Sequence, residues 1–435
     1  MNTLLTSGST AVEIAESIER AIRAQEIVTG QLLPAVRLLA SQLQVSPNTV
    51  AAAYKLLRNA GWVDTDGRRG TRVAEQGVTQ VARHALPGHL RNAASGNVDG
   101  RLLPRLNGDW LAQWPADTGH DLQGDDPGLL EVARQWLLEQ AVPGEHIGVF
   151  HGAMDAMEKA LRAHCRPGNR VLVEDPCWPP VLALLANLRL KPVALRADEL
   201  GACPPGTDPL REVAAVILTP RAQNPTGHSF SSARWQAWSI ALQDAADTLL
   251  ILDDHWGPLS QAEPPLLAPL PARWVHITSV SKFLGPDLRL SVVAANAHLL
   301  ADMQRLQAVA SRWVSHLLQR IAARLWQAAI TDGQLQRAAM SYAQRRSTLI
   351  QALNAQSVTC EPSAEGLHLW IGVADETSAV QALASYGWAV QAGKPFRLGE
   401  GAQIRVSIAN LDMDDLPGLA KDVSKALRVS HKPVY

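Results

Sequence analysis

The sequence predicts a multidomain protein in which a small α+β domain precedes a large α/β body. The chain has 435 residues, which is too long for one ordinary core and allows about three domains. The first 75 residues show three helical segments followed by two short strands. Further along, short apolar runs alternate with helical segments, as in a mostly parallel sheet. We therefore expect domains at 8–76 and 96–435, joined by a linker at 77–95 that lacks a strong period.

The composition excludes several classes of protein. With 47% apolar and 19% charged residues, the chain is typical of a folded globular protein. Its four cysteines have no paired spacing, so we expect no disulfide framework, no metal site and a cytoplasmic protein. We also expect no signal peptide and no membrane partner, because no apolar run reaches the roughly 18 residues that span a bilayer. The net charge is −1, but residues 34–72 carry six basic and two acidic side chains.

Three helices and a hairpin account for the first domain. Apolar residues at helical spacing predict helices over 11–25, 35–43 and 47–59. Each of the first and third helices has a capping residue, and the third begins with proline, which suits a first turn. The strands, at 62–65 and 71–73, enclose a turn that contains glycine and arginine. This order of elements is that of a winged helix-turn-helix, whose third helix enters the major groove of DNA.

Two motifs of this domain resemble the DNA-binding domain of the GntR family. They are Pro34–Ala40 and Ser46–Lys55. The resemblance implies that double-stranded operator DNA is a partner, contacted by the arginine of the first motif and the start of the third helix. The alternative is a small helical packing domain that binds no DNA. The candidate DNA-binding residues, with the two arginines of the wing, are Arg37, Ser46, Asn48, Thr49, Lys55, Arg58, Arg68 and Arg69.

The body is predicted to carry a binding site at the carboxyl ends of its strands. Buried strands are indicated by the apolar runs 171–173, 215–218, 249–252 and 274–277. A lysine, Lys282, follows the last of these runs in the sequence Ser279-Val280-Ser281-Lys282, and Arg289 comes seven residues later. This stretch is typical of a site for pyridoxal 5′-phosphate (PLP), in which the lysine amine forms a Schiff base with the aldehyde.

Candidates exist for the other groups that PLP needs. The phosphate would be held by Ser279, Ser281 and Arg289, and by the backbone of a helix that begins at Gly152, Ala153 and Met154. A carboxylate for the pyridine nitrogen, a ring for stacking and a donor to the phenolic oxygen are offered by Asp253, Trp178 and Asn224. Late in the chain, Arg405 could bind the carboxylate of a substrate or effector. Taken singly, these residues could instead be a helix cap, a core side chain or a surface ion pair.

Together, the order and spacing of these residues resemble fold-type I, aspartate aminotransferase-like enzymes with large and small subdomains. From about residue 10 onward, the chain is similar to the MocR/GabR subfamily of GntR regulators, which join a winged helix to an aminotransferase-like domain. Residues 221–227 look most like the PtsJ-type branch. The resemblance implies PLP bound through Lys282 and a domain-swapped, head-to-tail homodimer.

The sequence departs from the aminotransferase pattern at two tyrosines. Where that pattern has the tyrosine that bonds the phenolic oxygen, this chain has His255 and Trp256. The tyrosine that reaches the phosphate of a neighbouring subunit has no clear match in 119–124. Both changes weaken the case for efficient turnover, although His255 could still donate to the phenolic oxygen.

We therefore hypothesise a PLP-dependent transcription regulator that senses an amino compound or a B6 vitamer and then changes its operator affinity. One alternative is a functional aminotransferase that carries a DNA-binding domain. Another is a DNA-binding protein with a vestigial pocket, against which Lys282, Asp253 and Asn224 argue.

Overall fold

The computed structural model describes two compact units. One contains residues 1–80 with 165–171 and 180–192, and the other contains 81–164, 172–179 and 193–435. Within these units the residues that the structure describes are 7–66, 70–74, 88–106, 108, 110, 124–205, 207–243, 245–262, 270–361 and 364–429.

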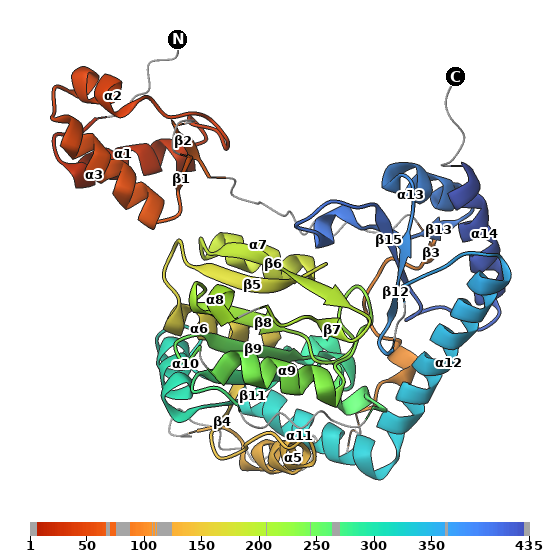
Figure 1. The fold of residues 1–435 in the computed structure, drawn as a ribbon. Helices are drawn as coiled ribbons and strands as arrows, with labels where there is room; N and C mark the ends of the chain where they lie inside the picture. Colours follow the sequence, from red (N-terminus) through yellow and green to blue (C-terminus); the bar gives the residue numbers. More distant parts are fainter. Residues whose placement is uncertain are drawn as a thin grey trace. The chain divides into compact units, whose positions relative to one another are not determined.

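The N-terminal domain, here called the head, has the predicted order of elements (Figure 1). Its helices are α1 (Ala11–Arg23), α2 (Val36–Leu43) and α3 (Pro47–Asn59). The antiparallel hairpin that follows consists of β1 (Val63–Asp66) and β2 (Gly70–Val73). The winged helix-turn-helix is thus confirmed, while the wing arginines Arg68 and Arg69 lie outside the described residues.

Local capping interactions explain where the helices of the head begin. Thr10 and Glu13 form a capping box, in which the Thr10 hydroxyl accepts from the Glu13 N–H at 3.2 Å and the Glu13 carboxylate accepts from the Thr10 N–H at 3.3 Å. Ser46 caps α3 by accepting from the Thr49 N–H at 3.1 Å, and Pro47 occupies the first turn. Apolar residues one helical turn apart meet in a core of their own that includes Ile14, Ile18, Leu39, Val50 and Leu57.

The body is built on an eight-stranded mixed sheet in the order β4-β11-β10-β9-β8-β5-β6-β7 (Figure 1). Strands β8, β9 and β10 run parallel to one another, and β11 is antiparallel to both β10 and β4. Most of the central residues are buried, which explains their apolar sequences. The strands are β4 (Ile147–Phe150), β5 (Arg170–Asp175), β6 (Lys191–Asp198), β7 (Gly201–Ala202), β8 (Ala215–Leu218), β9 (Leu249–Asp254), β10 (Trp274–Ser279) and β11 (Ser291–Ala295).

Helices lie beside this sheet, and α9 lies in front of it in the view of Figure 1. A second, smaller sheet has the order β12-β15-β14, and a two-residue strand β3 pairs with β13. The strands are β3 (Arg91–Asn92), β12 (His368–Gly372), β13 (Trp388–Ala389), β14 (Gln391–Ala392) and β15 (Gln403–Ser407). The longer helices are α5 (Pro127–Glu139), α6 (Ala153–His164), α7 (Pro179–Asn187), α9 (Ser232–Gln243), α10 (Ala297–Val309), α11 (His316–Thr331), α12 (Gln334–Ala355), α13 (Glu376–Ser385) and α14 (Asp415–Val429).

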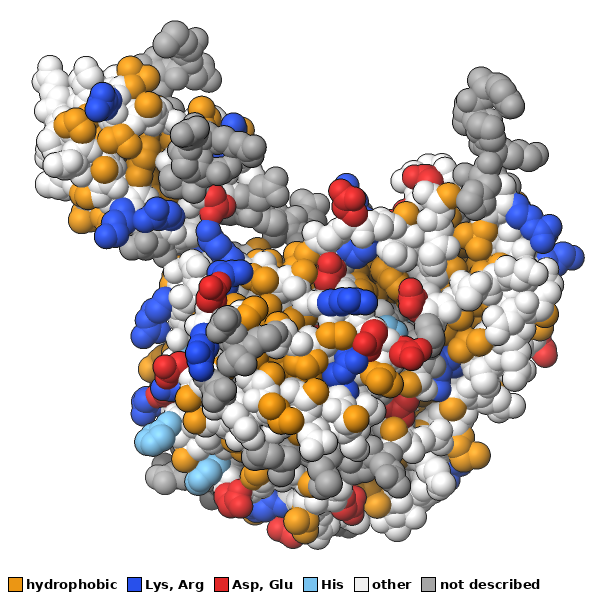
Figure 2. All heavy atoms as spheres, viewed as in Figure 1, with side chains coloured by type: hydrophobic (Ala, Val, Ile, Leu, Met, Phe, Trp, Pro, Cys, Tyr) orange, Lys and Arg blue, Asp and Glu red, His pale blue; other side chains and the backbone are white. Residues whose placement is uncertain are grey.

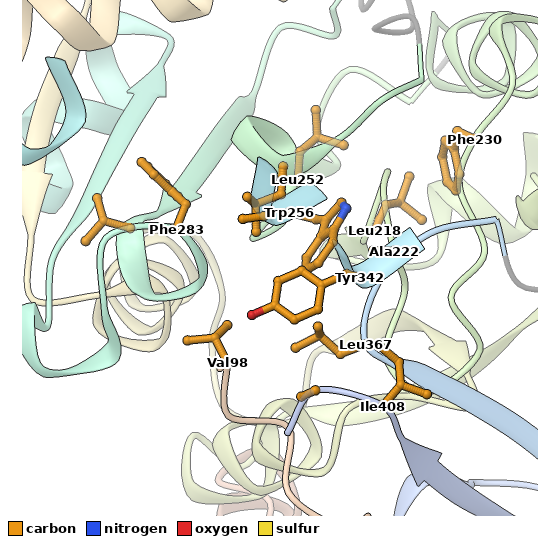
Figure 3. Close-up of a cluster of buried hydrophobic side chains, with 14 of the residues drawn as sticks. Val98, Leu218, Ala222, Phe230, Leu252, Trp256, Phe283, Tyr342, Leu367 and Ile408 are labelled. Carbon is orange, nitrogen blue, oxygen red and sulfur yellow. The ribbon is translucent and has the colours of Figure 1, made fainter. Parts of the chain in front are cut away.

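The core of the body joins the large sheet to α12 and to the small sheet. Figure 3 shows Trp256 beside Tyr342, with Leu252 of β9, Leu367 and Ile408 around them. The two aromatic rings are 5.8 Å apart between centroids and tilted by 55°. Among the described residues, no helix is long and apolar enough to cross a membrane.

Candidate functional site

The head exposes one set of polar residues along α2 and α3. Arg37 is exposed near the start of α2, and Asn48, Lys55 and Arg58 are exposed on α3. Because Val50, Ala53, Tyr54 and Leu57 of α3 are buried, the exposed residues occupy the opposite side of that helix. Figure 2 shows Lys and Arg side chains at the surface of the head, interspersed with hydrophobic ones. A helix with such a face can enter the major groove.

The start of α3 is stabilised by local contacts between Ser46 and Thr49. The Ser46 hydroxyl oxygen lies 2.8 Å from the Thr49 hydroxyl and also accepts from the Thr49 N–H. Both candidate DNA-binding residues therefore stabilise the helix end that would approach a phosphate, in the manner of an N-cap.

In the body, the structure brings Lys282 and Asp253 together at the carboxyl ends of the strands. Asp253 lies near the end of β9, and Lys282 follows β10 in a short 3-10 helix, Val280–Lys282. The Lys282 Nζ donates to the carbonyl of Gly96 at 2.6 Å. Burial, and to a smaller extent the Arg405 cation, lower the pKa of Lys282 to about 8, while Asp253 opposes the shift. A lysine so placed has a larger fraction of neutral, nucleophilic amine at neutral pH.

The neighbouring carboxyls Asp253 and Asp254 have different environments. Burial and the charge of Asp254 raise the pKa of Asp253 to about 7, although Lys282 lowers it. Burial also raises the pKa of Asp254, but Arg221 at 3.3 Å and His276 at 3.4 Å outweigh it and bring the value to about 2. Asp254 is thus ionised, and Arg221 balances its negative charge within the protein. The Oδ1 atom of Asp254 also accepts from the Gly257 N–H. Asp253 is the carboxyl left for a ligand.

Arg405 and Asn224 meet beside Lys282. The Arg405 guanidinium donates to the Asn224 side-chain oxygen at 3.0 Å, to Gln391 at 2.7 Å and to the carbonyl of Ala94 at 2.5 Å. Burial lowers the pKa of Arg405 to about 9, and the side chain is only 4% exposed. These three acceptors of Arg405 are neutral groups. They do not balance the positive charge of the guanidinium, which therefore suits a carboxylate ligand.

A second group of residues surrounds the start of α6. Gly152 has a φ of +87°, and a Cβ atom there would lie 3.3 Å from Nη2 of Arg289. Glycine therefore lets the Arg289 guanidinium approach the backbone that opens the helix. The Gly152 N–H was expected to face the phosphate. In the structure it instead donates to the Phe150 carbonyl at 2.8 Å within the turn. Ala153 and Met154 form the first turn of the helix, where free N–H groups face anions.

The remaining predicted residues are distributed around these two groups. The Ser279 hydroxyl accepts from the Ser281 N–H at 3.4 Å, which fixes the turn before Lys282. Trp178 is half-buried immediately before α7. Of the two residues at the missing tyrosine, Trp256 packs in the core on Tyr342, whereas His255 is in the field of Lys282. Burial, together with Lys282, lowers the pKa of His255 to about 4.

Lys282, Asp253, Asn224 and Arg405 form a group of side chains that is here called the pocket. Several residues beside it were not predicted from the sequence. Glu174, at the end of β5, is 4% exposed, and burial raises its pKa to about 8. Gly96 and Gln391 contact Lys282 and Arg405, and His368 faces Gly96 from β12. The alternation of the strand 368–372 could have indicated that His368 points to the same face as Trp370, but not that this face lines the pocket.

These residues fit PLP. In the part of the chain that the structure describes, the Asp253 Oδ1 atom is buried and has no hydrogen-bond donor. A protonated pyridine nitrogen would supply that donor, and the Gly152–Arg289 cradle has the charge and backbone geometry for a phosphate. No group of three or more His, Cys, Asp or Glu side chains among the described residues could hold a metal ion.

Comparisons with known proteins identify both parts of the chain. Residues 10–73 match the family of bacterial regulatory proteins called gntR, and residues 140–423 match aminotransferase class I and II. The vitamin B6 salvage pathway transcriptional repressor PtsJ of Salmonella typhimurium is 36% identical over 97% of this chain and 99% of its own length. The pyridoxine biosynthesis transcriptional regulator PdxR of Corynebacterium glutamicum is 27% identical over 96% of each chain.

Solved structures agree on the fold of the body. A kynurenine aminotransferase from Pyrococcus horikoshii has a TM-score of 0.72 at 17% identity, covering 79% of this chain and 92% of its own. A multiple substrate aminotransferase from Thermococcus profundus has a TM-score of 0.72 at 18% identity, covering 83% and 98%. The chain thus belongs to the aminotransferase class I and II family and, through its gntR-family head, to the MocR/GabR subfamily of GntR transcription regulators.

Proposed function

We propose that the protein is a PLP-dependent, DNA-binding transcription regulator whose body senses an amino compound or a B6 vitamer. The observation that carries this proposal is the convergence of Lys282, Asp253, Asn224 and Arg405 in one pocket of a chain that also has a gntR-family head. Two relatives whose names refer to vitamin B6 or pyridoxine support a B6 vitamer as cofactor and signal.

Each part of PLP has a residue that would hold it. Lys282 would hold the aldehyde, Asp253 the pyridine nitrogen, and Arg289 with the start of α6 the phosphate. Trp178 would stack on the ring, and Asn224 and His255 would face the phenolic oxygen. When bound, PLP supplies an aldehyde that captures primary amines. Arg405 would bind a carboxylate on such an amine.

Regulation requires that the ligand bind two states of the protein with different affinity. We propose that ligand binding in the pocket changes the arrangement of the heads and thereby the affinity for operator DNA, with a coupling of about 1–3 kcal/mol. Winged-helix regulators commonly bind two half-sites, so we propose that the functional form is a homodimer, acting in the cytoplasm where its DNA partner is.

The second candidate function is that of an aminotransferase. The lysine, the carboxyl and the arginine favour it, but Trp256 is in the core and His255, whose pKa is about 4, stands where a phenol would tune the ring. Binding an amine makes smaller demands than the proton transfers of turnover. We therefore expect slow or absent transamination with common oxo acids.

Lys282→Ala tests the assignment of the cofactor site. The wild-type protein should show a visible absorption band, and borohydride should attach the cofactor covalently to the peptide that contains Lys282. The Lys282→Ala variant should lose both signals, whereas Lys421→Ala, at an exposed position of α14, should keep them. A covalent adduct that persists in Lys282→Ala would contradict the assignment.

Operator binding tests the regulatory role. DNA fragments from the promoter beside the gene should bind the wild-type protein, and their affinity should differ between cofactor-free, PLP-bound and amine-treated protein by about 5- to 150-fold. Equal affinity in all three states would exclude regulation through this pocket. Rapid multiple turnover with an amino acid and an oxo acid would favour the aminotransferase instead.

A further inference from the structure

Three nitrogen-bearing side chains converge on Gly96. The Lys282 Nζ donates to the Gly96 carbonyl at 2.6 Å. A Cβ atom on Gly96 would lie 3.3 Å from both Cε1 and Nε2 of His368 and 3.9 Å from Nη1 of Arg405. The outer edge of the His368 ring and the end of the Arg405 guanidinium therefore face the same small volume beside the Lys282 amine.

The small sheet explains why His368 and Arg405 face the same way. Strands β12 and β15 are antiparallel, with His368 opposite Ser407 and Trp370 opposite Arg405. Residues two apart on a strand share a face, so His368 and Arg405 are diagonal neighbours on one face of this sheet. Their relative position is fixed by the strand register, and both are 5% exposed or less.

The surroundings of His368 are unusually basic. Burial lowers the pKa of His368 well below its usual value, and the charges of Arg405, Lys282 and His255 lower it further. Each of these groups comes from a different element: Arg405 from β15, Lys282 from the 3-10 helix after β10, and His255 from the residue after β9. Burial and the charges of Arg405 and Lys282 therefore favour the neutral ring of His368, although Asp253 partly offsets the charge of Lys282.

We propose that His368 is a specificity-determining residue of the effector pocket, which bonds a ligand carboxylate together with Arg405 and takes up a proton as that carboxylate binds. The proposal rests on the proposed function and narrows its ligand to an amino carboxylate. An anion placed against Arg405 offsets the positive field that, together with burial, keeps His368 neutral, so a proton binds more readily. The protonated ring then makes a charge-assisted hydrogen bond to the same anion, which a plain amine cannot receive.

Two probes with the same number of carbons separate the carboxylate from the amine. Propionate carries only the carboxylate and is ionised throughout the range from about pH 6 to 8, and propylamine carries only the amine. Propionate binding to the PLP-loaded full chain should strengthen as the pH falls, by up to about tenfold per pH unit for one linked proton. Propylamine should show the opposite dependence, because only the neutral amine reacts.

Titration calorimetry measures the proton directly. In two buffers of different ionisation enthalpy, the apparent heat of propionate binding to the wild type should reveal net proton uptake near pH 6. His368→Gln retains a hydrogen-bonding group without a titrating proton, so it should bind propionate with no proton uptake. His368→Phe should lose most propionate binding and still capture propylamine.

A matched control is His164→Gln. His164 is a partly buried histidine on α6 whose pKa is also lowered, first by burial and then by Arg273, away from the pocket groups. Its replacement should leave proton uptake unchanged. Absence of proton uptake in the wild type, or retention of it in His368→Gln, would overturn the role of His368. If the wild-type protein showed no visible absorption band after incubation with PLP, that result would instead contradict PLP binding and the proposed function.

Discussion

The head and the pocket obtain their functional residues in different ways. In the head, the hydroxyl that caps α3 and the N–H it bonds are three residues apart, and the core residues recur at helical spacing. In the pocket, Lys282 bonds a carbonyl 186 residues away, and Arg405 bonds an amide 181 residues away. The head thus depends on local structure that a short segment specifies, whereas the pocket depends on the whole fold of the body.

The two regions also differ in electrostatics. The candidate DNA-binding residues Arg37, Lys55 and Arg58 are exposed, so water screens their charges. The pocket residues Lys282, Asp253 and Arg405 are largely or wholly buried, and each has a shifted pKa. Exposed positive charge of this kind suits a polyanion, while the buried charges of the pocket suit one small ligand.

The largest effect that would separate the two regions is expected from Leu57→Ala. Leu57 is 1% exposed in the core of the head, so its truncation should destabilise the head by about 2–5 kcal/mol. Urea unfolding followed by DNA binding measures this loss, while the visible cofactor band should persist. The adjacent Leu56 is 42% exposed, and Leu56→Ala should change stability by less than about 0.5 kcal/mol. Simultaneous loss of the band in Leu57→Ala would show that the head and the pocket fold as one unit.

In the pocket, the next largest effect is a pH dependence of stability in cofactor-free protein. Because the folded pKa of Asp253 is about 7 and the unfolded value is about 3.9, the folded state binds more protons between these values. The contribution of Asp253 to stability should therefore fall as the pH rises from about 4 to 7, by at most about 1.4 kcal/mol per pH unit. His255 and His368, whose folded pKa values are lowered, should contribute the opposite slope below about pH 6.5.

Urea unfolding at several pH values checks this slope. Asp253→Asn should remove the Asp253 contribution, so stability should fall less, or rise more, with pH than in the wild type. Glu174, whose pKa is about 8, contributes with the same sign as Asp253 in both proteins. Asp414→Asn, at an exposed position, is the control and should leave the slope unchanged. A slope that is identical in Asp253→Asn and the wild type would show that Asp253 is ionised throughout.

A smaller effect is expected from the cap of α3. Ser46→Ala removes the acceptor for the Thr49 N–H and should cost about 1 kcal/mol of head stability. Ser41→Ala, at an exposed position within α2, is the control in the same thermal unfolding experiment. Equal stability of Ser46→Ala and Ser41→Ala would mean that Pro47 alone determines where α3 begins.

The smallest effect concerns the salt dependence of DNA binding. If Arg37 contacts a phosphate, Arg37→Ala should reduce the slope of log affinity against log salt by about one unit. Arg20→Ala, an exposed arginine on α1, serves as the control. Asn48→Ala should instead relax sequence preference, since base contacts and not phosphate contacts distinguish operators. An unchanged slope in an Arg37→Ala, Arg68→Ala double variant would exclude this mode of docking.

The sequence predicted the head almost to the residue, because caps and helical periods are local signals. The third helix was expected over 47–59 and spans Pro47–Asn59. The central strands were also predicted, since continuous apolar runs mark strands buried on both faces. For the site, Lys282 and Arg289 share one short connection between β10 and β11, so their spacing is visible in the sequence.

Other parts of the pocket could not be predicted. Gly96 and His368 belong to no short motif, and only the chain path past Lys282 and the register of β12 with β15 bring them into the site. Likewise, the sequence alone could not decide whether His255 or Trp256 occupies the position of the tyrosine that bonds the phenolic oxygen in aminotransferases. Packing of Trp256 on Tyr342, from a helix far along the chain, distinguishes them.

The two-residue strand β3 has a consequence for the pocket. Its pairing with β13, the Arg91 guanidinium 3.4 Å from the Trp388 ring centroid, and the Arg91–Asp415 ion pair together anchor the polypeptide immediately before Ala94 and Gly96. Ala94 bonds Arg405 and Gly96 bonds Lys282, so the contacts of β3 with β13 and α14 fix the chain path that brings these two carbonyls to the site.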